Sequence, residues 1–202
     1  MTANAVAFNI GATTNAAGLF NTQAAGLYAG IYMDDPSTRY KLAGGVLAST
    51  ETLPMWGGVG LQELIPTGGL DVRGNQIKRS TIQTNLTGFA VFNQNGAAIN
   101  SPQSPVPVTL VGNQVNFFRL GSGAQITLEI DPALASLDGG LITQQVSWDY
   151  TNQKIVAYDS VAALPIKILS IQTSQAKTVN YTTGTSVAKW TDTGNAVAIV
   201  II

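Results

Sequence analysis

The chain has 202 residues and a formal net charge of −1, and it contains neither cysteine nor histidine. The lack of thiols and imidazoles excludes zinc fingers, iron–sulfur clusters, thiolate nucleophiles and every catalytic triad that uses a histidine base. Only 10 basic and 11 acidic side chains are present, about half of what an average composition gives, and such a weakly charged surface suits a protein covered by neighbours.

Neither nucleic acid nor a membrane is an expected partner. The basic residues are scattered, and only Lys78 and Arg79 are adjacent, so the chain lacks an electrostatic footprint for nucleic acid. The opening sequence MTANAVAFNIGATTN has neither the basic nor the long apolar region of a signal peptide. No stretch approaches the roughly 20 apolar residues that a membrane span needs. We therefore expect a soluble chain that is made in the cytosol.

The first 33 residues carry no charged side chain, and within them AAGLF at residues 16–20 recurs as AAGLY at residues 24–28. Runs of small residues interrupted by glycine do not favour a helix. We interpret residues 1–27 as an extended N-terminal arm, laid along the body or along a neighbouring subunit. A flexible terminus is the alternative.

Two later segments, residues 35–45 and 131–140, share the start and stop signals of a short helix. In each, an aspartate precedes a proline and a pair of glycines closes the segment. Aspartate accepts the first free backbone N–H groups, proline fixes φ at the first helical position, and glycine allows a left-handed exit. The pattern predicts helices of about two turns that begin at Pro36 and Pro132.

Most of the remaining chain predicts β-strands. Residues 125–130 alternate strictly between polar and aliphatic side chains, and residues 146–150 alternate as well, with Trp148 on the inward face. A turn at residues 151–153 followed by residues 155–158 predicts a hairpin. The chain ends in AVAIVII, whose β-branched residues favour a buried strand over residues 197–202.

Three further segments are apolar on both faces or change phase midway, namely residues 88–92, 115–120 and 166–173. This pattern is typical of strands that lie between two layers or contain bulges. The many short strands and frequent turns predict a mainly β fold, a β-sandwich or barrel of jelly-roll-like form with two short connecting helices. We expect one β-rich domain over residues 28–202, with a candidate lobe boundary, or one long loop, at residues 100–107.

The sequence offers few candidates for catalytic, metal-binding or phosphate-binding residues. Glu129 and Asp131 share one face of a predicted strand about 7 Å apart, a spacing that suits a pair of catalytic carboxylates or oxygen ligands for calcium. However, helix capping already accounts for Asp131, and the solvent face of an amphipathic strand accounts for Glu129. The glycines of residues 69–74 are not a phosphate loop, because Asn75 stands where its lysine belongs. We expect no catalytic residue, metal site or cofactor.

The aromatic and apolar residues point instead to contacts with protein surfaces. Trp56 follows Leu53, Pro54 and Met55 in an apolar bend, and tryptophan and methionine are enriched at the centres of interfaces. Core packing is the alternative for Trp56 and the better account of Trp148. The candidate interface residues are Leu19, Phe20, Leu27, Tyr28, Leu53, Met55 and Trp56.

A resemblance to a known family adds a function. Residues 30–63 read GIYMDDPSTRYKLAGGVLASTETLPMWGGVGLQE, and this run resembles capsid cement or decoration proteins of tailed bacteriophages. Residues 139–159, GGLITQQVSWDYTNQKIVAYD, are similar to the C-terminal half of that family. The resemblance implies a protein, often a trimer, that docks on the outer face of the virion head and clamps neighbouring major capsid subunits. It would be synthesised in the host cytoplasm and would carry no catalytic residue.

Other functions remain open. A head fibre or a tail-associated receptor-binding protein should show heptads or a β-helix repeat, and neither is present. A carbohydrate-binding module should place aromatic residues on one exposed strand face, whereas Trp56, Trp148 and Trp190 are dispersed along the sequence. An enzyme would rest on Glu129 and Asp131 alone. We also expect oligomerisation to cover residues 53–56 and 197–202, because these are the apolar segments whose exposure to water is least favourable.

The composition of residues 1–27 leads to a first prediction. If this segment becomes ordered only against a neighbouring subunit or a capsid, limited proteolysis of the isolated protein should trim it before any other region. Assembled particles should protect the same segment. Equal resistance in the isolated and assembled states would contradict the prediction.

Overall fold

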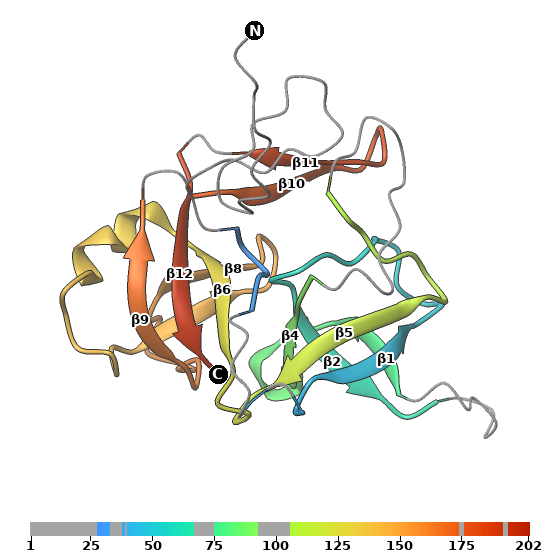
Figure 1. The fold of residues 1–202 in the computed structure, drawn as a ribbon, viewed down its shortest axis with the longest axis horizontal. Coiled ribbons are helices and arrows are strands. Elements are labelled where there is room, and N and C mark those ends of the chain that lie inside the picture. Colours follow the sequence, from blue (N-terminus) through green and yellow to red (C-terminus); the bar gives the residue numbers. More distant parts are fainter. Residues whose placement is uncertain are drawn as a thin grey trace, which may run out of the picture.

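The computed structural model describes residues 28–32, 38, 40–66, 75–92, 106–173, 176–191 and 194–202. In this part of the chain the fold is mainly β, as the sequence predicts. It consists of a closed five-stranded barrel, a five-stranded sheet packed beside it, and a separate two-stranded hairpin (Figure 1). The prediction of an N-terminal arm over residues 1–27 and most of the residues of the first predicted helix lie outside the described residues.

The barrel is built from the first five strands of the described chain. Its strands follow the order β1–β3–β2–β4–β5, and β5 pairs with β1 to close the ring. All pairs are antiparallel except β1 with β3. A 3₁₀ helix, η1 (Gln83–Asn85), joins β3 to β4. The strands are β1 (Ala43–Leu47), β2 (Gly60–Leu64), β3 (Gln76–Arg79), β4 (Gly88–Ala90) and β5 (Gln114–Arg119).

The five-stranded sheet takes most of the second half of the chain. Its order is β7–β8–β6–β12–β9, with β6 and β8 parallel and the other pairs antiparallel. The 3₁₀ helix η2 (Pro132–Leu137) connects β6 to β7. The strands are β6 (Gln125–Ile130), β7 (Val146–Asp149), β8 (Lys154–Ala157), β9 (Lys167–Gln172) and β12 (Ala196–Ile201).

The C-terminal strand lies inside this sheet, between β6 and β9. The prediction of a buried strand is confirmed, since Val197, Ala198 and Val200 have no exposed surface. The expectation that oligomerisation covers this segment is wrong. Its neighbours within the same chain already bury it, so it needs no second copy.

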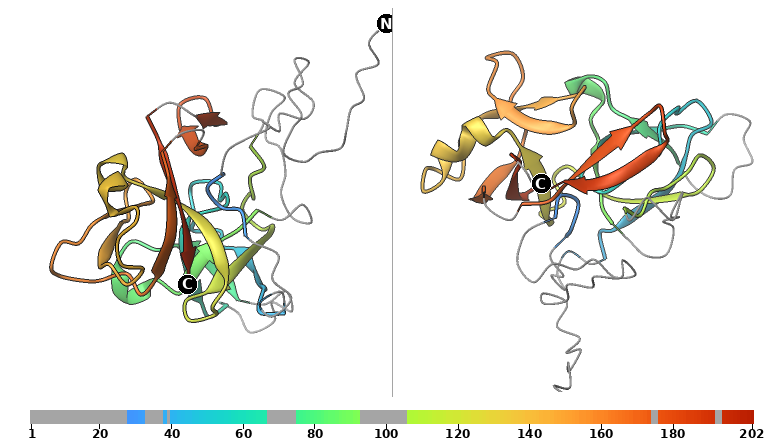
Figure 2. Two further views of the ribbon diagram at one scale, coloured as in Figure 1. Left: turned by 60° about the vertical axis from the view of Figure 1, so that its left-hand side comes forward. Right: turned by 90° about the horizontal axis from the view of Figure 1, so that it is seen from above.

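The remaining two strands, β10 (Thr178–Thr182) and β11 (Val187–Thr191), form an antiparallel hairpin. Figure 2 shows this hairpin as a separate layer that lies across one end of both larger parts. Its side chains alternate, with Val179, Tyr181, Ala188 and Trp190 packed toward the body of the protein. The sequence analysis did not identify this hairpin.

Strands β4 and β5 hold the barrel and the sheet together. Ala90 and Phe117 belong to the core inside the barrel, whereas Phe89 and Phe118 belong to the core shared with the five-stranded sheet. Both faces of these two strands are therefore buried in apolar surroundings. This confirms the prediction that residues 88–92 and 115–120, apolar on both faces, lie between two layers.

The phase change in β9 is a bulge. The pairing register between β9 and β12 shifts, so that Ser170 lies opposite Ile199 and Ile168 lies opposite Val200. Leu169 is the extra residue, and its side chain is 39% exposed. Because of this insertion Ile168 and Ile171 are both buried although they are three residues apart, as the sequence pattern predicts.

The helix predicted at Pro132 is present, as a 3₁₀ helix. The carboxylate of Asp131 accepts a hydrogen bond from the backbone N–H of Ala133 at 3.0 Å, and Gly139 follows the helix with φ of +77°. The hairpin between β7 and β8 is confirmed as well. In the first predicted helix, however, the closing glycines Gly44 and Gly45 lie in β1, where they bring β1 close to neighbouring side chains.

Residues 28–32, called the strap below, run between the barrel and the sheet. The backbone N–H of Gly30 donates to Thr127 of β6 at 2.7 Å, and its carbonyl accepts from Phe92 at 2.9 Å. Gly30 has φ of +88°, and a Cβ at this position would lie 2.2 Å from the carbonyl carbon of Gly57. Only glycine fits this crossing, because both the backbone angle and the space exclude a side chain.

The strap gives a test with an internal control. We expect Gly30→Ala to lower the free energy of unfolding by several kcal/mol, since a steric clash adds to the cost of about 1–2 kcal/mol for a left-handed non-glycine residue. Gly112 has φ of +80° and nothing within 4 Å of its hypothetical Cβ, so Gly112→Ala should cost only the backbone strain. Urea unfolding measures both variants. Equal losses would show that the strap is not tightly packed.

Candidate interaction surface

The bend that carries Trp56, residues 51–58, is organised by one buried carboxylate. Glu51 is only 7% exposed. Its Oε1 accepts hydrogen bonds from the backbone N–H groups of Thr52 and Leu53, at 3.1 and 3.3 Å, and its Oε2 accepts one from the N–H of Arg79 at 2.9 Å. A single side chain thus holds the start of the bend against the edge of the barrel.

Arg79 holds the other side of the bend. Its guanidinium lies 4.4 Å from the centroid of the Trp56 ring, donates a hydrogen bond to the carbonyl of Pro54, and lies 4.0 Å from Glu51. Burial lowers the pKa of Arg79 to about 10, and the nearby Glu51 acts in the opposite direction. The guanidinium therefore remains charged at neutral pH, and the bend is supported by an ion pair and a cation–π contact.

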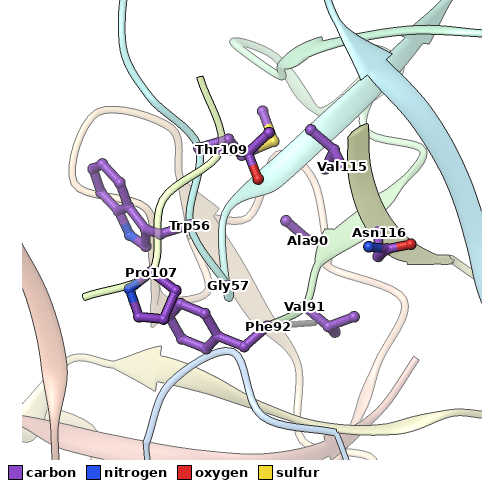
Figure 3. A pocket seen from close by; sticks show the side chains of 10 residues that line it. Trp56, Gly57, Ala90, Val91, Phe92, Pro107, Thr109, Val115 and Asn116 are labelled. Atoms are coloured by element: carbon purple, nitrogen blue, oxygen red, sulfur yellow. The ribbon is translucent and has the colours of Figure 1, made fainter. Parts of the chain in front are cut away.

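Five half-buried aromatic side chains, called the aromatic cluster below, gather where the bend, the strap and the β10–β11 hairpin meet. Ring centroids are 5.6 Å apart for Trp56 and Tyr181, 5.4 Å for Phe92 and Trp190, and 5.2 Å for Tyr28 and Trp190. Figure 3 shows Trp56 and Phe92 beside Pro107 at this junction. The cluster comprises Tyr28, Trp56, Phe92, Tyr181 and Trp190.

The structure places the predicted interface residues unequally. Leu53, Trp56 and Tyr28 are half-buried and lie close to this junction. Met55 is 1% exposed, because its side chain lies in the barrel core and its backbone pairs with Thr109. It therefore offers no side-chain surface to a partner. Leu19, Phe20 and Leu27 lie outside the described residues.

The sequence analysis missed the residues that support this surface. In the sequence, Arg79 was distinguished only by its position next to Lys78, and nothing indicated a contact with Trp56. Tyr181 and Trp190, in contrast, alternate with polar residues along β10 and β11, and this period of two could have revealed the hairpin. The aromatic residues are also less dispersed than the sequence indicated, since Trp56 and Trp190 lie in one cluster.

A sugar-stacking platform does not fit this cluster. Its rings meet one another at interplanar angles between 32° and 82°, so their faces pack internally and do not form one open plane. Trp148 is only 4% exposed and packs edge-to-face against Phe89 at 4.9 Å. The prediction that Trp148 belongs to the core is confirmed.

Cavities near the bend are too small for a ligand. The hollow between Trp56, Phe92 and Pro107 has a volume of about 10 Å³ (Figure 3), about the minimum that holds one water molecule. Small-molecule sites usually have volumes of about 300–1,000 Å³. A wider hollow of about 390 Å³ beside Tyr40 and Arg119 is open and shallow.

Two further searches cover only the described residues. Within them, no three His, Cys, Asp or Glu side chains gather closely enough to hold a metal ion. No helix in the same part of the chain has the length and hydrophobicity that crossing a membrane requires.

The carboxylates Glu129 and Asp131 occupy different environments. Asp131 caps η2 and forms an ion pair with Lys154 at 2.8 Å, and this lysine, followed by the N–H of Ala133, lowers the pKa of its carboxyl. Glu129 was expected on a solvent face, but it is half-buried and hydrogen-bonded to Thr178 of the hairpin. Burial raises its pKa to about 7 despite the nearby Lys154. Each carboxylate has structural partners.

Comparisons with known proteins found no match to this chain. No protein-family model matches the chain, and neither the curated proteins nor the solved structures with which it was compared include a match.

Two Glu–Arg pairs in the barrel allow a matched test of the bend. The pair of Glu51 and Arg79 is buried, whereas Glu63 and Arg119 form a partly exposed pair at 2.7 Å. We expect Glu51→Gln to cost about 3 kcal/mol of unfolding free energy, because a buried guanidinium loses its counter-charge. Glu63→Gln should cost less than about 1 kcal/mol. Chemical denaturation measures both, and the reverse order would contradict this account of the bend.

Proposed function

We propose that the protein is a structural component of a bacteriophage virion, which binds the outer surface of the capsid and clamps neighbouring major capsid subunits. One observation carries this proposal. The specific part of the sequence resemblance, the DDP–R–LAGG–LA–TETLPMWGG string, ends with TETLPMWGG at residues 50–58, and these residues form a bend that is fixed by Glu51 and Arg79. A rigid loop with half-buried apolar side chains binds a partner at low entropic cost.

The weakly charged surface supports the same function. With 21 charged side chains among 202 residues, the protein has few groups that would need to lose water in an interface. Contacts of moderate strength to several capsid subunits would add through avidity. The major capsid protein is then the principal partner, and the resemblance favours a trimer as the binding unit.

The N-terminal segment would contribute to this clamp. Residues 1–27 join the body at Tyr28, which contacts Trp190 and bridges to Lys177 beside the hairpin. We propose that they form an arm that leaves the body next to the aromatic cluster and becomes ordered against a neighbouring subunit. The arm and the bend would then engage the capsid from the same region of the molecule.

Leu53 is a better probe of this contact than Trp56. The ring of Trp56 packs against both Arg79 and Tyr181, so Trp56→Ala should lower stability as well as binding. Leu53 is half-buried and belongs to none of the core clusters found among the described residues. A carboxylate at this position should oppose docking through its desolvation cost and leave the fold intact.

Co-sedimentation with empty heads of the same virus tests the function. Wild-type protein should pellet with the heads at low and at high salt, because few ion pairs are available to screen. Leu53→Asp should weaken attachment at least tenfold with an unchanged melting temperature. Val161→Asp is the matched control, because Val161 is 83% exposed in the loop after β8 and should tolerate the charge. Well-folded wild-type protein that stays in the supernatant would overturn the proposal.

A further inference from the structure

Glu129 joins the outer face of β6 to the β10–β11 hairpin through a hydrogen bond with Thr178. On β6, Ile126, Leu128 and Ile130 point into the shared core, so Thr127 and Glu129 point to the opposite face. Two segments cover that face. The strap lies over Thr127, and the start of the hairpin lies over Glu129, whose carboxyl is hydrogen-bonded to the hydroxyl of Thr178.

Apolar residues lie beside Glu129 on the β12 side. Val197 lies directly opposite it on β12 and packs with Ala29 and Ala176 in a small buried cluster. Thr178 itself is almost completely buried. A carboxyl group between these residues loses most of its hydration when the hairpin is seated, and the ionised form loses much more than the neutral form.

The hairpin is the part of the fold that can respond to this cost. Its two strands pair with each other and with no other strand of the described chain, apart from the single bridge between Tyr28 and Lys177. Figures 1 and 2 show it as a layer of its own, distinct from the barrel and from the five-stranded sheet. Two-stranded hairpins have little stability of their own, so their seating depends on a few contacts.

We propose that Glu129 is a pH-dependent latch: its neutral carboxyl lets the β10–β11 hairpin seat on the five-stranded sheet, and its ionisation loosens the hairpin. Loosening would expose the apolar face of Val179, Tyr181 and Trp190, which packs against the other members of the aromatic cluster, Tyr28, Trp56 and Phe92. The latch would therefore control the accessibility of this surface. It does not depend on the proposed capsid function.

The direction of the pH effect follows from the raised pKa. Seated beneath the hairpin, Glu129 has a pKa of about 7, against an ordinary value of 4.5. Between these two values the seated state binds more protons than the open state, so its stability is complete below about pH 4.5 and is lost as the pH rises through 7.

Other charged groups near Glu129 do not change over this range. Lys154 and Asp131 form an ion pair in which the pKa of the lysine is raised and that of the aspartate is lowered, so both stay charged between pH 5 and 8.5. Lys154 and the hydrogen bond with Thr178 partly stabilise the ionised form of Glu129, whereas Asp131 opposes it and burial, the largest effect, outweighs them. The titratable residues of the covering strap are Tyr28 and Tyr32, and those of the hairpin and the residue that precedes it are Lys177, Tyr181 and Lys189.

Hydrogen exchange across a pH series tests the latch. Protection factors, corrected for the intrinsic pH dependence of exchange, are measured for the amides of β10 and β11 between pH 5 and 8.5. We expect them to fall at least tenfold between pH 5 and 7 in the wild-type protein and to change little above pH 7, while those of β6 and β12 remain unchanged. Glu129→Gln should keep the hairpin protected at every pH, because a neutral amide of the same shape replaces the carboxyl.

Asp138→Asn is the matched control, because Asp138 is an exposed carboxylate beyond η2 and its replacement removes the same charge. This variant should retain the wild-type pH dependence. Hairpin protection that is constant from pH 5 to 8.5, or a pH dependence that persists in Glu129→Gln, would overturn the proposal. A loss of protection shared equally by β6 and β12 would also overturn it, since the whole fold rather than the hairpin would then respond.

Discussion

The structure depends on two strands that are apolar on both faces. Phe117 and Ala90 fill the barrel, and Phe118 and Phe89, on the reverse of the same strands, pack against the five-stranded sheet. Because β4 and β5 contribute to both cores, neither core can be dismantled without exposing the other. This shared layer fixes the position of the barrel relative to the sheet.

The polar elements act on this scaffold at its borders. Glu51 and Arg79 fix the bend at the rim of the barrel, and the strap at Gly30 ties β6 to the end of β4. The hairpin closes the same side through the aromatic cluster and Glu129. Among the described residues, the hollow at the bend has a volume of about 10 Å³, and no group of acidic side chains is arranged to hold a metal ion.

Local patterns in the sequence predicted local structure well. The alternation of residues 125–130, the aspartate and proline at 131–132 and the turn at 151–153 each led to an observed element, because a few neighbouring residues decide such elements. Contacts between residues that are far apart in the sequence could not be predicted from these local patterns. The pattern of Glu129 indicated a solvent face, but Thr178, almost 50 residues later, covers it. Arg79 likewise acquires its role only when β3 brings it beneath Trp56.

Differential scanning calorimetry of Phe117→Leu and Phe118→Leu tests the shared layer most directly. The two side chains are adjacent on β5 but point into different cores. If the layer couples the barrel to the sheet, both variants should lower the midpoint of one transition whose calorimetric and van't Hoff enthalpies agree. Two separate transitions, with Phe117→Leu shifting one and Phe118→Leu leaving that one unchanged, would show that the barrel and the sheet unfold independently.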